Sequence, residues 1–154
     1  MSARILIVDD VEANVRLLEA KLTLEYYDVL TCQDGETAIA LAKAEQPDLI
    51  LLDVMMPGLD GFETCRRIKE DEETRHIPVV LVTALDSRQD RIRGLRADAD
   101  DFLTKPLDDA ILMARVKSLS RLKMITDELR EREETSRRFG VDLAGVSRLH
   151  AAGG

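Results

Sequence analysis

Aromatic side chains are scarce in this sequence of 154 residues, making up 3% of it, and tryptophan is absent. Surfaces that stack on nucleotide bases depend on such side chains, so the composition argues against them. Basic residues are outnumbered as well, with 22 Lys and Arg against 30 Asp and Glu, for a formal net charge of −8. A chain of this charge repels a phosphate backbone, so we expect no direct binding of nucleic acid.

Cysteines and long apolar runs are also few. Cys32 and Cys65 match no paired thiol motif, so the sequence predicts no disulfide scaffold and no cysteine-rich metal site, only buried or half-buried small residues. No apolar stretch approaches the roughly 20 residues of a membrane span, and the N-terminus does not resemble a signal peptide. We expect a cytoplasmic protein with no membrane partner. His76 and His150 are expected to be surface histidines.

What the sequence does contain is three short, unbroken apolar runs: Ile5–Val8, Leu49–Leu52 and Val79–Val82. Because these runs do not alternate with polar residues, they predict strands buried on both faces, as in a parallel sheet covered by helices. Asp28–Cys32 and Asp101–Thr104 are weaker strand candidates. Helical periodicity lies between the strands, at 13–24, 36–44, 62–69 and 88–96. This alternation predicts an α/β fold with a doubly wound, five-stranded parallel sheet.

A much longer helical pattern runs from Asp108 to about Arg138 without Pro or Gly. Its apolar residues recur at steps of three and four, at Leu112, Val116, Leu119, Leu122, Ile125 and Leu129. The segment 127–138 is almost all charged, which predicts a solvated or paired signalling helix, with a plain interdomain linker as the alternative. We therefore expect a domain over 1–122, a helical extension over 123–139 and a linker over 140–154 that is truncated before a further domain.

Reactive side chains follow the predicted strands. Asp9 and Asp10 come after the first apolar run, Asp53 after the second and Thr83 after the third, while Lys105 follows the last strand. The carboxyl ends of parallel strands meet at one edge of a sheet, so these side chains should converge. Carboxylates that share a pocket repel one another unless a cation is present, and an all-oxygen site favours Mg²⁺. With a hydroxyl and an ammonium group beside it, such a site can carry a phosphoryl group on an aspartate.

Each of these residues has a simpler explanation when it is taken alone. An Asp after a strand often caps the following helix. Thr83 could be a buried hydroxyl bonded to the backbone, and Lys105 a surface charge. Their joint placement at the ends of four strands favours a site.

Four segments in this order resemble the signature set of bacterial response-regulator receiver domains: Ile5–Asp10, Leu51–Gly61, Val82–Ala84 and Lys105–Pro106. The resemblance covers about residues 2–120. It implies a flavodoxin-like strand order with five helices, here with an extended last helix. It also implies Mg²⁺ as the cofactor and a sensor histidine kinase as the phosphodonor.

The resemblance assigns metal-binding roles to four residues. Asp53 matches the phosphoacceptor, and Asp10 and Asp53 match the direct Mg²⁺ ligands. Asp9 matches the carboxylate that reaches the metal through water. Met55 matches the position whose backbone carbonyl completes the set of protein ligands.

Further residues match the phosphoryl contacts and the switch of the family. Thr83 and Lys105 match the two side chains that bind the phosphoryl oxygens, and Pro106 matches the proline whose preceding peptide bond is typically cis and shapes this loop. Phe102 falls at the position of the rotating aromatic switch, although an ordinary core aromatic is the alternative. Movement of Thr83 and Phe102 would remodel the face formed by the fourth helix, the fifth strand and the fifth helix.

Met55 and Leu85 lie two residues after Asp53 and Thr83, beside the expected path of a hydrolytic water. Both side chains are apolar and cannot orient that water. The sequence therefore predicts slow dephosphorylation.

Segments 2–22 and 75–80, and the long helix running into 130–133, closely resemble the first receiver of PleD-type GGDEF response regulators. Such proteins continue with an adaptor receiver and a diguanylate cyclase domain. The resemblance implies a phosphorylation-dependent homodimer that activates the cyclase in the parent chain, while this fragment is not itself an enzyme. A free-standing receiver acting as an adaptor or phosphate relay is the alternative. A transcription factor would need a helix-turn-helix, and a Mg²⁺ phosphohydrolase an Asp-x-Asp motif in place of the adjacent Asp9 and Asp10.

Overall fold

Strands and helices alternate throughout residues 2–138, the part of the chain that the computed structural model describes. The strands are β1 (Arg4–Val8), β2 (Asp28–Cys32), β3 (Leu49–Asp53), β4 (Val79–Thr83) and β5 (Asp101–Thr104). The helices are α1 (Glu12–Leu24), α2 (Gly35–Glu45), α3 (Gly61–Glu70), α4 (Arg88–Arg96) and α5 (Asp109–Arg138). All strand pairs are parallel, in the order β2-β1-β3-β4-β5. The predicted flavodoxin-like doubly wound fold is confirmed.

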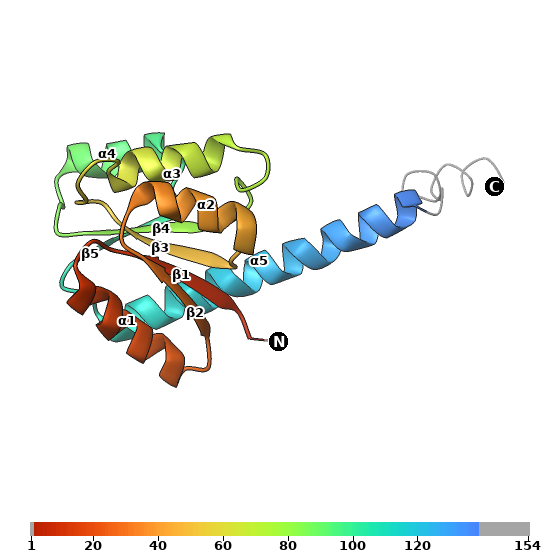
Figure 1. The fold of residues 1–154 in the computed structure, drawn as a ribbon, viewed down its shortest axis with the longest axis horizontal. Helices are drawn as coiled ribbons and strands as arrows, with labels where there is room; N and C mark the ends of the chain where they lie inside the picture. Colours follow the sequence, from red (N-terminus) through yellow and green to blue (C-terminus); the bar gives the residue numbers. More distant parts are fainter. Residues whose placement is uncertain (1, 139–154) are drawn as a thin grey trace. The chain divides into compact units, whose positions relative to one another are not determined.

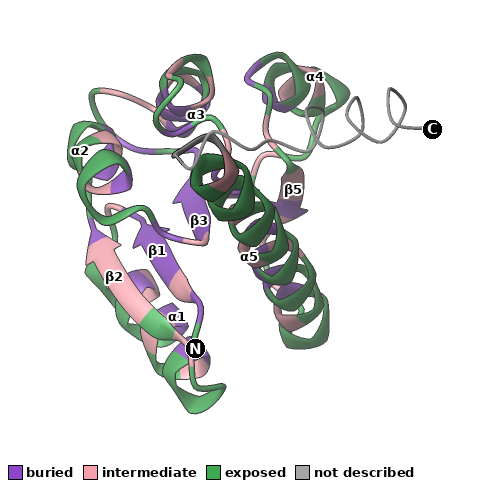
Figure 2. Cartoon of the chain, turned by 90° about the vertical axis from the view of Figure 1, so that its right-hand side faces the viewer, coloured by how far each residue is buried: buried purple, intermediate pink, exposed green. Residues whose placement is uncertain are grey.

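Burial of the strands follows their place in the sheet. Every residue of β3 and β4 is buried, and so is β1 after Arg4, whereas the edge strands β2 and β5 are mostly half-buried (Figure 2). Helices α2, α3 and α4 cover one face of the sheet, and α1 with the beginning of α5 covers the other (Figure 1). Unbroken apolar runs form the inner strands because helices cover both of their faces.

Polar caps begin α2, α3 and α4, three of the helices that follow the carboxyl edge of the sheet. Asp34 and Asp60 are the N-caps of α2 and α3, and their side chains accept the backbone N–H groups of Thr37 and Glu63. Ser87 begins α4 with a capping box. A Cβ on Gly61 would lie 2.6 Å from the Cα of Val54, so the turn between β3 and α3 closes only around glycine. This close approach fixes the backbone that follows Asp53.

The face of α5 that packs on the sheet changes along the helix. Leu112 and Val116 are buried, but the next buried residues are Ser120 and Lys123, and Leu122 is 58% exposed. The Nζ of Lys123 lies 3.7 Å from Asp48, whose other carboxylate oxygen accepts the N–H of Arg4. This ion pair ties the helix to the amino edge of the sheet.

Contacts group the residues up to Lys123 into one compact unit and those from Met124 onward into another. The division after residue 122 and the role of 123–139 remain predictions. The expected linker at 140–154 and His150 lie outside the described residues. Among residues 2–138, no helix has both the length and the apolar character needed to cross a membrane.

Candidate functional site

Three acidic side chains meet at the carboxyl edge of the sheet. Asp9 and Asp10 follow β1, and Asp53 is the last residue of β3. Each offers a carboxylate oxygen, and these oxygens all lie within 4.8 Å of one another. Asp9 and Asp53 are only 3% and 6% exposed. The convergence predicted from their positions after buried strands is therefore present.

Asp9 has both a local and a long-range contact. One carboxylate oxygen accepts the N–H of Val11 at 2.9 Å, and the other lies 3.5 Å from the Nζ of Lys105. Val11, the N-cap of α1, has no side-chain capping bond. The bond of Asp9 therefore orders the turn before α1 and caps no N–H within the helix, while its second oxygen faces the cluster.

Lys105 reaches into this acidic cluster from the loop after β5. Its Nζ lies 3.3 Å from Asp53, and its side chain is 31% exposed. Its backbone N–H donates to the carbonyl of Thr83 at 2.8 Å, and the peptide bond to Pro106 is cis. Lys105 is therefore held against two carboxylates and is not a freely solvated surface charge.

The electrostatics of the cluster favour a cation. Burial raises the pKa of Asp53 above its ordinary value, the nearby Asp9 raises it further, and Lys105 offsets these effects only in part. Three hard, anionic oxygen donors at this spacing fit Mg²⁺, which accepts a few protein ligands and keeps several waters. Met55, in the loop directly after β3, is 58% exposed, so its side chain is not enclosed by the site.

Thr83 ends β4 next to the acidic cluster. It is fully buried, and its Oγ1 accepts the N–H of Leu85 at 3.0 Å. A hydroxyl that accepts one hydrogen bond can still donate its own proton. Thr83 can therefore bond an oxygen placed in the site while its position stays coupled to the loop before α4.

Comparison with known proteins gives the family. The sequence profile of the response regulator receiver domain matches residues 5–117, most of the chain. The chain belongs to the receiver-domain family. It is 64% identical over all 154 residues to the response regulator PleD of Caulobacter vibrioides, and it is PleD-like in sequence. The chain spans about a third of that protein, 34% of its length.

Two further relatives bear on the site and on domain organisation. Protein PilH of Pseudomonas aeruginosa is 42% identical over 117 residues, which are 76% of this chain and 97% of PilH. The receiver domain of the sensor histidine kinase PA1611 from Pseudomonas aeruginosa is 32% identical, with a TM-score of 0.72 over 78% of this chain and 98% of that one. That structure has a magnesium ion in its active-site cleft. Receiver domains bind Mg²⁺ at the acidic pocket, and this receiver has the acidic cluster.

The expected switch residue of this receiver lies on β5 against α4. Phe102 is half-buried, and a Cβ on Gly94 would be 3.0 Å from its ring. The Cζ of Arg91 lies 5.4 Å from the centroid of the same ring. Phe102 is thus positioned by α4 as well as by the core, and its role as a switch remains a prediction.

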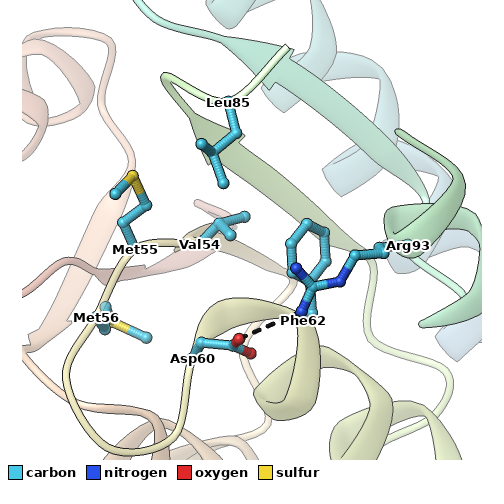
Figure 3. Close-up of a pocket in the computed structure, with 7 residues that line it drawn as sticks. All are labelled: Val54, Met55, Met56, Asp60, Phe62, Leu85 and Arg93. Carbon is cyan, nitrogen blue, oxygen red and sulfur yellow. Dashed lines mark ion pairs between the residues drawn. The ribbon is translucent and has the colours of Figure 1, made fainter. Parts of the chain in front are cut away.

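A hollow of about 350 Å³, lined in part by the residues that directly follow Asp53, opens between the loops after β3 and β4 (Figure 3). It is lined by Val54, Met55, Met56, Asp60, Phe62, Leu85 and Arg93. The sequence indicated Met55 and Leu85 as neighbours of the site but gave no indication of Phe62 or Arg93. These two come from α3 and α4, and only the packing of the two helices brings them together.

The thiols of the two cysteines take no part in this chemistry. Both are buried and free, as expected. Burial raises the pKa of the Cys65 thiol to about 12 and that of Cys32 to about 11. Neither thiol is activated.

Proposed function

We propose that this receiver accepts a phosphoryl group on Asp53 in a Mg²⁺-dependent reaction, with a sensor histidine kinase as the donor. One observation supports the proposal most. Asp53 shares its pocket with two further carboxylates and with the Nζ of Lys105 at 3.3 Å. This set combines a nucleophile, a cation site and a fixed positive charge.

In the proposed reaction, a carboxylate oxygen of Asp53 attacks phosphorus, and the bond from phosphorus to the imidazole nitrogen of the donor breaks. Lys105 stabilises the charge on the phosphoryl oxygens, and Thr83 donates a hydrogen bond to one of them. Asp10 and Asp53 would hold Mg²⁺ directly, with Asp9 acting through water and Met55 through its carbonyl. Bound there, the ion supplies positive charge that offsets the carboxylates and the phosphoryl oxygens.

Phosphorylation would then act on the α4–β5–α5 face. A phosphoryl oxygen that accepts the Thr83 hydroxyl would draw the Thr83 side chain toward Asp53, and the N–H of Leu85, which donates to the same hydroxyl oxygen, would move with it. The loop before α4 and the ring of Phe102 would then move with the Thr83 side chain. In the parent chain, we infer that phosphorylation favours a homodimer, which brings together the diguanylate cyclase domains that PleD-type proteins carry after an adaptor receiver.

Incubation with acetyl phosphate and Mg²⁺, followed by intact mass spectrometry, tests the phosphoacceptor. We expect one added phosphoryl group per chain, none with Asp53→Asn, and unchanged addition with Asp28→Asn, which removes an exposed charge of the same kind on β2. Omission of Mg²⁺ should reduce the yield strongly, by roughly tenfold or more. Addition that persists in Asp53→Asn would contradict the assignment.

A free-standing receiver, acting as an adaptor or phosphate relay, is the second candidate. It is favoured by the match to PilH, of which this chain covers 97%. The two candidates differ in whether phosphorylation changes the association state, not in the chemistry at Asp53.

A further inference from the structure

Helix α4 has very little apolar contact with the rest of the receiver. Its only buried residue is Gly94, its apolar Ile92 is half-buried, and Leu95 is 73% exposed. Helix α3, on the same face of the sheet, buries Phe62, Cys65 and Ile68. Burial of apolar side chains is the main force that packs a helix on a sheet, so with Gly94 and part of Ile92 alone covered, other interactions must contribute to holding α4.

Arg93 attaches α4 to α3. Its Cζ lies 4.3 Å from the centroid of the Phe62 ring, and its Nη2 lies 3.6 Å from the carboxylate of Asp60 (Figure 3). Asp60 is itself fixed, because its other oxygen accepts the N–H of Glu63 as the N-cap of α3. The guanidinium therefore binds one ring and one carboxylate that both belong to the start of α3.

Arg91 makes the corresponding attachment on the other side of α4. Its Cζ lies over the Phe102 ring of β5, 5.4 Å from the centroid. Its Nε and Nη2 donate to the same oxygen of Asp86, at 3.0 and 2.6 Å, and this oxygen also accepts from the Thr104 hydroxyl at 3.3 Å. Again one arginine binds a ring and a carboxylate. We call the two sets the arginine clasps: Arg93 with Phe62 and Asp60, and Arg91 with Phe102 and Asp86.

The carboxyl end of α4 is held differently. Ala97, its C-cap, is buried, and its carbonyl accepts the Sγ–H of Cys65 at 3.3 Å in the core. This end is therefore fixed by burial, whereas the first two turns bury only part of Ile92 and depend mainly on charged and cation–π contacts made by exposed arginines. Such contacts are weak and screened by salt, unlike apolar burial.

We propose that α4 is a hinged helix, fixed at Ala97 and held down at its amino end by the two arginine clasps, and that it opens locally when they are weakened. Arg93 and Phe62 also line the hollow between the loops after β3 and β4, so opening removes one wall of that hollow. The proposal requires no phosphorylation. It can therefore fail or succeed independently of the function proposed for Asp53.

Amide hydrogen exchange on the unphosphorylated chain tests the hinge. Raising NaCl from about 50 to about 500 mM shortens the Debye length severalfold and should screen the clasps. We expect amides in the first two turns of α4 to exchange about fivefold faster, while those of Cys65 and Ile68 in α3 keep their rates. Equal acceleration in both helices, or none in α4, would overturn the proposal.

Substitution by methionine keeps the aliphatic stem of an arginine and removes its charge. Arg93→Met and Arg91→Met should each accelerate exchange in α4 about fivefold, and the double variant more, and they should remove most of the salt effect. Arg96→Met is the matched control, because Arg96 is an exposed arginine of the same helix that makes no ion pair or ring contact within residues 2–138. If Arg96→Met accelerates exchange as much as Arg93→Met, helix charge and not the clasps controls α4, and the proposal is wrong.

Discussion

At the scale of single residues, we expect Met55 and Leu85 to control the lifetime of the proposed phosphoryl group. Both line the hollow beside Asp53, Met55 with an exposed side chain and Leu85 with a half-buried one. Neither can orient a water for attack on phosphorus. We expect Met55→Asn to shorten the lifetime of the aspartyl phosphate about tenfold, because an amide can bond the attacking water.

Loss of phosphorylated protein over time, followed by mass spectrometry after removal of the donor, measures this lifetime. Leu24→Asn, the same kind of change at an exposed position at the end of α1, should leave the lifetime unaltered. If the phosphorylated wild-type protein loses its phosphoryl group within seconds, the prediction of slow dephosphorylation is wrong. A Met55→Asn variant with an unchanged lifetime would show that Met55 does not control access of water.

The site residues were predictable because their placement is local. Asp9, Asp53 and Thr83 come directly at the ends of unbroken apolar runs, so the strand pattern alone puts them at one edge. The partners of Arg93 and Lys123 could not be predicted in this way. Asp60 and Asp48 are distant in sequence, and only the packing of helices against the sheet makes them neighbours.

At the scale of elements, the N-cap of α2 is Asp34, whose carboxyl group titrates. The carboxylate of Asp34 accepts the N–H of Thr37 at 2.7 Å, and this bond lowers the pKa of the carboxyl. A lowered pKa means that the stabilisation is present above the pKa of the unfolded chain and is lost as pH falls through the folded value. We expect Asp34→Ala to reduce the free energy of unfolding at pH 7 by about 1 kcal/mol, measured by urea denaturation.

The control for this prediction is Asp34→Asn, which caps the helix without titrating. The difference in the free energy of unfolding between the wild type and Asp34→Ala should decrease as the pH falls below about 4, the ordinary pKa of an aspartate. The corresponding difference in the free energy of unfolding between Asp34→Asn and Asp34→Ala should stay constant over this pH range. If the difference between the wild type and Asp34→Ala does not change with pH, the charge of the carboxylate contributes nothing to the cap.

Helix boundaries were predicted to within one residue because caps and periodicity are local, but the buried face of α5 was not. The sequence pattern continues its apolar stripe through Leu122, which is 58% exposed, while Lys123 is buried in an ion pair with Asp48. A periodic stripe shows that a segment is helical. It does not show where that helix stops packing on its sheet.

At the scale of the whole molecule, the output of a receiver depends on what it associates with. It spans 34% of PleD but nearly all of PilH, so likeness alone does not distinguish a dimerising switch from a free-standing adaptor. The association state of the phosphorylated protein distinguishes the two. A net charge of −8 opposes self-association at low salt, so the proposed dimer would require a specific attractive surface.

Sedimentation velocity with Mg²⁺, with and without beryllofluoride as the phosphoryl mimic, measures this directly. We expect a monomer without the mimic, a dimer with it, and a monomer under both conditions for Asp53→Asn, since the mimic requires that carboxylate. If the protein stays a monomer while calorimetry shows that beryllofluoride is bound, the proposal of a phosphorylation-dependent dimer is wrong and the free-standing adaptor is favoured. Because the dimer must overcome like-charge repulsion, raising the salt to about 0.3 M should strengthen it if apolar contacts dominate its interface and weaken it if ion pairs do.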